Sequence, residues 1–387
     1  MTTTPRPHPS RHLVRALLGL GLLSSLITAA LGLRWLLSPG DALLAASGTP
    51  PPLLEILGSG PMYTAQLVVA VLGAVAGVAG LAITGSRASV SRLVAVVLAA
   101  VAAAQVALFG LGFASFMTLA QAGYLIALAM PVLLVTVAAL LVRHGGRARW
   151  AVGVPLLTAM VLGALLGAGI IRDVALAIIP AMVRSGGLIL VTVHFVLAGA
   201  LWAAVALLLL RRAGAFEGVE AWTVRWRRPL TIIAACGPLP YALSRLTWLT
   251  PWPIVGGEAA AADPATRVWG LALSTGAWLG VVLTLGLIRP WGEVFPRWFP
   301  VVGGRSVPIV TAAIPGFAIA ALLCFAAVPI LLSASEMGLA STLEFALVFP
   351  CWLWGPTLAL AVWGYVGHRR STIGSRADRM VSTKMDA

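Results

Sequence analysis

Charged side chains are scarce in this sequence: Asp, Glu, Lys and Arg make up 10% of its 387 residues, and hydrophobic residues make up 60%. A soluble domain carries about 25% charged residues, so this composition excludes a water-soluble surface over most of the chain. Lipid must therefore surround much of the protein. The long apolar runs are continuous and show no period of two, which favours membrane-spanning helices over a β-barrel.

Cysteine and acidic residues are also rare, and familiar catalytic motifs are missing. The cysteines Cys236, Cys324 and Cys351 lie inside apolar runs without a CxxC pair, which is typical of small packing residues and not of a disulfide or metal site. No P-loop, HExxH or GxSxG motif occurs. No Asp or Glu lies deep in an apolar run, although proton-coupled carriers commonly use one. We therefore predict no catalytic residue, metal or cofactor, and an enzyme acting on lipid is the least favoured function.

The apolar runs predict an all-α, polytopic transmembrane helical bundle with about ten spans, since a span needs roughly 20 apolar residues. The first run, at about 14–37, is longer than the core of a signal peptide, so we expect an uncleaved span there. The predicted organisation is a cytoplasmic tail at 1–13, six spans in 14–210, a basic cytoplasmic loop at 211–229, four spans in 230–366 and a basic cytoplasmic tail at 367–387.

The net charge of +14 comes almost entirely from arginine, with Lys384 as the single lysine. With the N-terminus inside, about 21 of the 26 basic residues fall on the cytoplasmic side, but only about five of the 12 acidic residues do. Because one miscounted span would invert every later loop, this asymmetry predicts that both termini are cytoplasmic, in a plasma membrane. We expect the basic loops to contact anionic lipids, so the charge requires no nucleic-acid partner. The heavy use of Arg, Ala and Gly suggests a bacterial source.

A few polar residues inside the expected spans are the candidate substrate-binding residues: Arg245, Tyr241, His194, Gln105 and Trp248. At 1.5 Å per helical residue, Arg245 lies roughly 8 Å below the outer edge of a ~30 Å apolar core. The same arithmetic places His194 roughly 10 Å deep and Gln105 near 12 Å. Tyr241 is one helical turn below Arg245. These residues are therefore predicted to share one layer in the outer half of the membrane.

Two interpretations of this layer stay open. In the first, it lines a pocket open to the outside, where Arg245 holds an anionic group and Pro238 and Pro240 break the seventh span. In the second, Arg245 extends to the outer interface or makes a structural pair, and Trp248 is an ordinary interfacial residue. For His194, a neutral hydrogen bond between helices is the simpler interpretation.

Three further features carry structural expectations. The stretch Arg172–Gly186 either lies on the outer surface or dips into the membrane as a re-entrant segment. The pairs Gly73/Gly77, Gly163/Gly167 and Gly276/Gly280 follow the GxxxG spacing that allows close approach of helices. The loop Arg289–Pro300 combines arginine with Trp and Phe, which suits a segment in the inner headgroup region, and Glu293 and Arg297 would pair there if it is helical.

The segments Pro238–Pro253 and Arg289–Pro308 resemble a family of multi-span integral membrane proteins in actinobacteria that has no assigned activity. The resemblance covers mainly the second half of the chain. It implies a membrane location and a polytopic architecture, and it transfers no catalytic residue. Two functions are then weighed. The first is a transporter or permease-like protein for an unidentified small anionic ligand. The alternative is a non-catalytic scaffold, sensor or assembly partner that binds a membrane partner through the basic loop 211–229.

Overall fold

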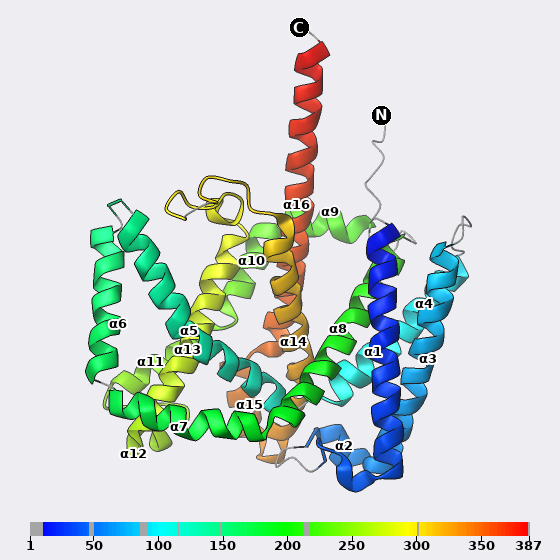
Figure 1. The fold of residues 1–387 in the computed structure, drawn as a ribbon, viewed down its shortest axis with the longest axis horizontal. Coiled ribbons are helices and arrows are strands. Elements are labelled where there is room, and N and C mark those ends of the chain that lie inside the picture. The colour runs from blue at the N-terminus through cyan, green and yellow to red at the C-terminus, as the bar shows by residue number, and fades with distance from the viewer. Residues whose placement is uncertain are drawn as a thin grey trace. The chain divides into compact units, whose positions relative to one another are not determined.

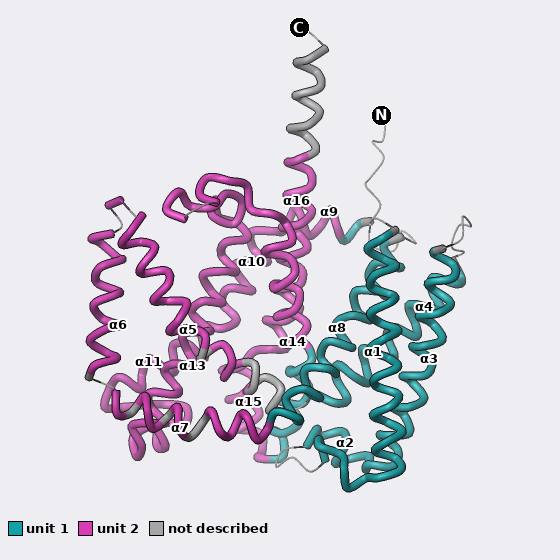
Figure 2. The backbone as a smooth tube through the Cα atoms, in the orientation of Figure 1, with its two compact units in different colours: residues 1–118, 186–219, 325–336 teal, residues 119–185, 220–324, 337–387 magenta. Residues whose placement is uncertain are grey.

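The computed structural model describes residues 11–45, 50–85, 92–114, 116–144, 146–147, 149–166, 168–212, 217–299 and 302–385, which are almost entirely helical. The one β feature in these ranges is an isolated antiparallel bridge between Val294 and Ser306. The predicted all-α class is therefore confirmed (Figure 1). The chain divides into two compact units, coloured separately in Figure 2.

Eight helices in the described part of the chain are long and apolar enough to cross a membrane, so the protein is a multi-pass membrane protein in contact with lipid. The two other expected spans, at about 151–171 and 230–248, are each divided between two shorter helices. The eight candidate spans are His12–Leu37, Ser59–Thr84, Leu93–Gly112, Gly123–His144, Gly186–Arg211, Pro264–Gly286, Ile309–Glu336 and Leu339–Ile373.

Unit 1 is a bundle built on the helices α1 and α3, which pack against each other. Gly32 of α1 faces Gln66 of α3, whereas Ser25 faces Gly73 and Leu18 faces Gly80. Residue numbers fall along α1 as they rise along α3, so the two helices run antiparallel. A short π-helical segment, Val106–Gly112, continues α4. The last part of helix α14 (Ile309–Glu336), from Phe325, completes the unit. Its helices are α1 (Arg11–Leu37), α2 (Pro52–Leu57), α3 (Ser59–Gly85), α4 (Arg92–Gln105) and α8 (Gly186–Arg212).

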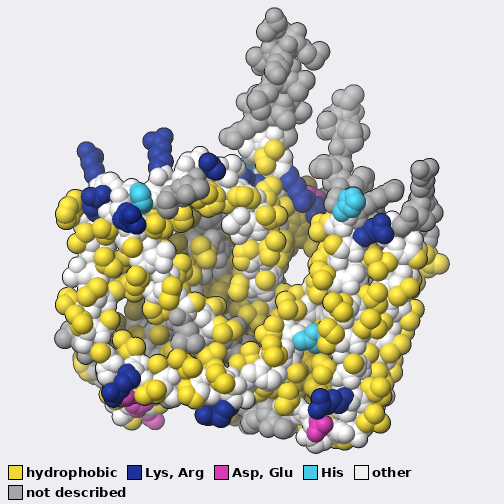
Figure 3. Space-filling view, viewed as in Figure 1, with side chains coloured by type: hydrophobic (Ala, Val, Ile, Leu, Met, Phe, Trp, Pro, Cys, Tyr) yellow, Lys and Arg dark blue, Asp and Glu magenta, His cyan; other side chains and the backbone are white. Residues whose placement is uncertain are grey.

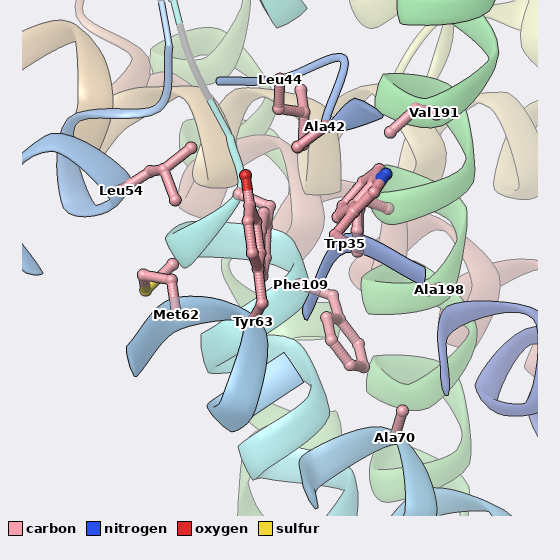
Figure 4. Packing of buried hydrophobic residues seen from close by; sticks show 12 residues of the cluster. Trp35, Ala42, Leu44, Leu54, Met62, Tyr63, Ala70, Phe109, Val191 and Ala198 are labelled. Atoms are coloured by element: carbon pink, nitrogen blue, oxygen red, sulfur yellow. The ribbon is translucent and has the colours of Figure 1, made fainter. Parts of the chain in front are cut away.

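Aromatic side chains form the core at one end of unit 1. Trp35 lies 5.4 Å from Tyr63 between ring centroids, and Phe195 stacks on Phe113 at 4.5 Å. Figure 4 shows Trp35, Tyr63 and Phe109 in this cluster, each from a different helical segment. These large rings are almost completely buried, so they fix the packing of the helices that carry the polar residues of this unit.

Unit 2 contains the remaining elements, including the first part of α14 (Ile309–Glu336). Its helix α9 lies within the expected basic loop 211–229, so that loop is partly helical. Its helices are α5 (Phe116–His144), α6 (Val154–Leu166), α7 (Ala168–Arg184), α9 (Glu217–Arg225), α10 (Arg227–Cys236), α11 (Leu239–Leu246), α12 (Gly257–Ala262), α13 (Pro264–Gly286), α15 (Leu339–Val348) and α16 (Cys351–Met385).

The stretch Arg172–Gly186, for which the sequence allowed a surface or a re-entrant position, belongs mostly to the helix α7. In unit 2 it lies across the end of α6 and α13 and does not turn back between them (Figure 1). Its exposed side chains include both the ion pair Arg172–Asp173 and the apolar Leu176 and Val183. This mixture suits a helix at the boundary between lipid and water. Within each unit, Figure 3 shows basic side chains gathered at the helix ends and hydrophobic side chains between them.

Candidate functional site

A broken helix in unit 2 positions the candidate residue Arg245. In the expected seventh span, the first helix, α10, ends at Cys236, and the second, α11, begins at Leu239 after Pro238. Proline lacks the N–H group that would continue the helix, so this break was predictable from the sequence. Gly237 sits against the ring of Trp354, where an added Cβ would lie 2.6 Å from Trp354 Cβ. The break is therefore packed tightly on α16.

Two aromatic rings flank the guanidinium of Arg245. Its Cζ lies 3.9 Å from the ring centroid of Trp248 and 4.9 Å from that of Tyr241. Trp248 is only 4% exposed and packs so closely on Gly270 that a Cβ there would clash with its ring. Tyr241 in turn contacts the ring of Phe349 at 4.7 Å. This arrangement provides cation–π attraction of about 0.5–2 kcal/mol in a partly desolvated position.

The same helix end holds the following loop by three hydrogen bonds. Arg245 Nη1 donates to the carbonyl oxygen of Val255 at 2.8 Å. Trp248 Nε1 donates to the carbonyl oxygen of Ile254 at 2.9 Å, and the Ile254 N–H donates to Thr247 Oγ1 at 3.0 Å. Residues 254 and 255 are thus fixed against α11 and the turn after it.

Val255 adopts a backbone conformation that is unusual for its residue type. Its φ is +53°, and the next residue, Gly256, has a φ of +71°. A β-branched residue in the left-handed region is a genuine outlier and costs on the order of 1–3 kcal/mol. The contacts that Arg245 and Trp248 make with this turn hold it in the strained form.

The charge of Arg245 has no acidic partner within the described residues. Ion pairs in that part of the chain join other groups, among them Arg34 with Asp41 and Arg227 with Glu293. The Nε atom of Arg245 is buried and lacks a hydrogen-bond partner among the described residues. A buried donor without a partner costs about 1–3 kcal/mol or more when it belongs to a charged group. The site therefore has unused capacity to bind an anion.

The other two candidate residues belong to unit 1 and have partners of their own there. His194 Nε2 lies 2.8 Å from Thr28 Oγ1. Thr28 Oγ1 also lies 2.8 Å from the carbonyl oxygen of Ser24, to which its hydroxyl donates, and the direction of the hydrogen bond with His194 follows the tautomer of the imidazole. Gln105 Nε2 donates to the carbonyl oxygen of Val69. His194 thus makes the hydrogen bond between helices that was the simpler interpretation.

The structure therefore brings together three of the five candidate residues: Tyr241, Arg245 and Trp248. Their spacing of four and three residues on one helical stretch was the signal that predicted this. His194 and Gln105 contribute instead to a buried polar layer of unit 1. That layer includes Gln66, whose Nε2 donates to the carbonyl oxygen of Thr28 at 3.1 Å.

A second group of polar side chains, at the other end of unit 2, was missed by the sequence reasoning. Arg369 is 5% exposed and donates to the carbonyl oxygen of Val307 at 2.9 Å. Arg227 Nη1 lies 3.6 Å from Glu293 Oε1, so Glu293 faces α10. The pairing of Glu293 with Arg297 was expected only for a helical segment, and the segment is helical only at Pro290–Gly292. Burial lowers the pKa of Arg227, and Glu293 opposes that shift.

Within the described residues, no group of three or more His, Cys, Asp or Glu side chains is arranged to hold a metal ion. Comparisons with protein-family models, with curated proteins and with solved structures find no match for this chain. The candidate site is therefore defined by its own geometry: a cation that lies against two aromatic rings, donates to a strained turn and lacks a carboxylate partner in the described part of the protein.

Proposed function

We propose that this protein is a permease-like protein of a bacterial plasma membrane that recognises a small anion at Arg245. The observation that carries the proposal is the uncompensated guanidinium, whose Nε atom is buried without a partner in the described residues. Placing a charge in an apolar environment without a counter-charge is unfavourable, and an anionic ligand would supply that counter-charge. An intramembrane ionisable residue is also a functional candidate by default.

The strained turn provides the way in for the anion. In the structure Arg245 Nη1 donates its hydrogen bond to the Val255 carbonyl oxygen, and Nε is buried away from solvent. An anion that binds in the plane of the guanidinium would accept hydrogen bonds from these atoms and compete with the carbonyl. Release of Val255 would relieve the backbone strain of the turn, so ligand binding and opening of the loop at residues 250–256 would support each other.

The aromatic rings then determine how the anion is held. The rings of Trp248 and Tyr241 lie against the guanidinium, and its N–H groups are the donors available to an anion. Planar bidentate recognition by arginine favours carboxylate and phosphate groups over spherical anions. We therefore expect carboxylates and phosphates to bind better than chloride.

The test uses the purified protein and a matched pair of variants. Arg267 is the control for Arg245, because it is a second arginine that donates to a backbone carbonyl oxygen, from its Nε to that of Ala260 in α12 at 3.2 Å. Thermal unfolding of the wild type in detergent is measured with acetate, phosphate and chloride at equal ionic strength. We expect acetate or phosphate to raise the midpoint in the wild type and in Arg267→Gln, and not in Arg245→Gln. Equal stabilisation of Arg245→Gln would remove Arg245 from the site.

Transport is tested separately in proteoliposomes with the anion that stabilises best. Uptake should exceed that of empty vesicles and should be lost in Arg245→Leu. If the anion stabilises the protein but is not taken up, the anion site is retained and the protein is a sensor that binds the anion without transporting it. Unchanged uptake by Arg245→Leu would contradict the proposed role of this residue.

A further inference from the structure

The segment between α13 and α14 is a hairpin and not the interfacial helix considered from the sequence. The Phe295 N–H donates to the carbonyl oxygen of Arg305 at 2.9 Å, and the Gly304 N–H donates back to that of Phe295 at 2.9 Å. The Val307 N–H donates to the carbonyl oxygen of Glu293 at 2.9 Å. We call residues 293–299 and 302–307 the inner hairpin.

The base of the inner hairpin is fixed by the helix α16. Arg369 donates to the carbonyl oxygen of Val307 at 2.9 Å, to Ser306 Oγ at 3.1 Å and to the carbonyl oxygen of Gly292 at 3.4 Å. The Tyr365 hydroxyl donates to the same Gly292 oxygen at 2.7 Å. A loop of this length is ordinarily mobile, but here two neighbouring turns of one helix hold its base. The hairpin is therefore preorganised.

The inner hairpin carries an excess of positive charge. Glu293 is the single acidic residue between 287 and 308, and it faces Arg227 at 3.6 Å and His368 at 3.5 Å. The negative charge of Glu293 is therefore paired at the base of the hairpin and does not neutralise the arginines farther along it. Arg297 and Arg305 are both exposed, and Gly303 places the two arms in contact, since a Cβ there would lie 2.8 Å from the carbonyl oxygen of Arg297.

Aromatic side chains accompany these arginines. The ring of Phe299 lies 4.6 Å from that of Trp298 and 6.0 Å from that of Phe295. Nearby, Trp291 is 43% exposed. Because the hairpin joins the ends of two candidate spans, α13 and α14, it lies at the membrane surface (Figure 1). Aromatic and basic residues together at that level are the combination that binds lipid headgroups.

We propose that the inner hairpin is a binding site for anionic phospholipid, in which Arg297 and Arg305 contact the headgroup phosphate. The aromatic rings of the hairpin lie at the boundary between headgroups and acyl chains. Arg369 is a positioning residue that keeps the two arms together without touching the lipid. The site is independent of Arg245 and of the anion proposed there.

The experiment measures phosphatidylglycerol and phosphatidylcholine of identical acyl chains bound to the full-length protein by native mass spectrometry. Phosphatidylglycerol should bind more tightly to the wild type. Each arginine near an anionic surface contributes about fivefold, so Arg297→Gln/Arg305→Gln should weaken phosphatidylglycerol binding about 30-fold. The charge-matched control is Arg172→Gln/Arg184→Gln, because both residues are exposed on α7 at the opposite end of unit 2. This control should bind like the wild type.

Three results would overturn the proposal. The first is equal binding of the two lipids by the wild type. The second is an equal loss of binding in the two double variants, which would indicate a general charge effect. The third is displacement of phosphatidylglycerol by excess inorganic phosphate, which would assign the arginines to a soluble ligand. Arg369→Met adds a separate readout: amide exchange in the hairpin should accelerate and lipid binding should weaken, with Arg297 and Arg305 unchanged.

Discussion

Replacing Gly73 by alanine should destabilise the protein, and replacing Gly163 by alanine should not. An added Cβ at Gly73 would clash with the Gln105 amide and would lie 2.5 Å from Ser25 Oγ. Both neighbours are completely or almost completely buried, so they have little room to move. At Gly163, which is exposed on α6, nothing lies within 4 Å of the added atom. The two glycines share the GxxxG spacing but differ in their surroundings.

The expected magnitudes follow from three contributions. Overpacking costs about 1–3 kcal/mol, and losing the hydrogen bond from Gln105 to Val69 costs about 0.5–1.5 kcal/mol. Alanine recovers at most about 1 kcal/mol of helix propensity. Gly73→Ala should therefore lose about 0.5–3.5 kcal/mol of unfolding free energy, whereas Gly163→Ala should gain up to about 1 kcal/mol. The two variants should shift in opposite directions.

The assay is equilibrium unfolding in mixed micelles, with the midpoint of helix loss followed by circular dichroism. Gly77→Ala is a second test in the same interface, because its Cβ would lie 3.2 Å from Leu22 Cα. It should behave like Gly73→Ala. If Gly73→Ala and Gly163→Ala shift the midpoint in the same direction by the same amount, the claim that Gly73 is needed for close packing of α1 on α3 is contradicted.

Three further predictions concern single hydrogen-bonding side chains. Trp202 Nε1 donates to Ser25 Oγ at 3.1 Å. Trp202→Phe removes this hydrogen bond and should lose about 1–3 kcal/mol of unfolding free energy in the same assay. Ser25→Ala should lose no more than that. Hydrogen bonds from the Thr266 hydroxyl and from two backbone N–H groups lower the pKa of Asp263 below its usual value near 4. This stabilisation is present above pH 4 and lost as the pH falls through the lowered pKa, so the midpoints of wild type and Asp263→Ala should converge there; a difference independent of pH would contradict it. Arg369→Met should lower the unfolding midpoint more than Arg370→Met, since Arg369 is buried.

The sequence was sufficient to predict the helical membrane architecture because composition and run length determine it. Continuous apolar runs predicted the long helices, and Pro238 predicted the break before α11. The division between α6 and α7 was not predictable, because the apolar pattern continues across it. Hydropathy reports which residues tolerate lipid, and it contains no information on where a helix turns along the membrane surface.

The candidate site was predictable to the extent that it depends on local helical spacing. Tyr241, Arg245 and Trp248 lie three and four residues apart, so one helical stretch brings them together whatever the rest of the chain does. The Val255 carbonyl depends on the path of a loop, which no periodic pattern encodes. Arg369 was assigned to a basic tail because its charge was counted as a topology signal, whereas its partners lie more than 60 residues away in the sequence.

The most direct test of the central claim is a binding titration of the best stabilising anion with the wild type, Arg245→Gln and Arg267→Gln by isothermal calorimetry. Loss of a charged hydrogen-bonding partner costs about 1.5–3 kcal/mol, which corresponds to about 10- to 150-fold in affinity. We predict that Arg245→Gln weakens binding by that factor and that Arg267→Gln leaves it within about twofold of the wild type. Equal affinities for the wild type and Arg245→Gln would contradict anion recognition at Arg245.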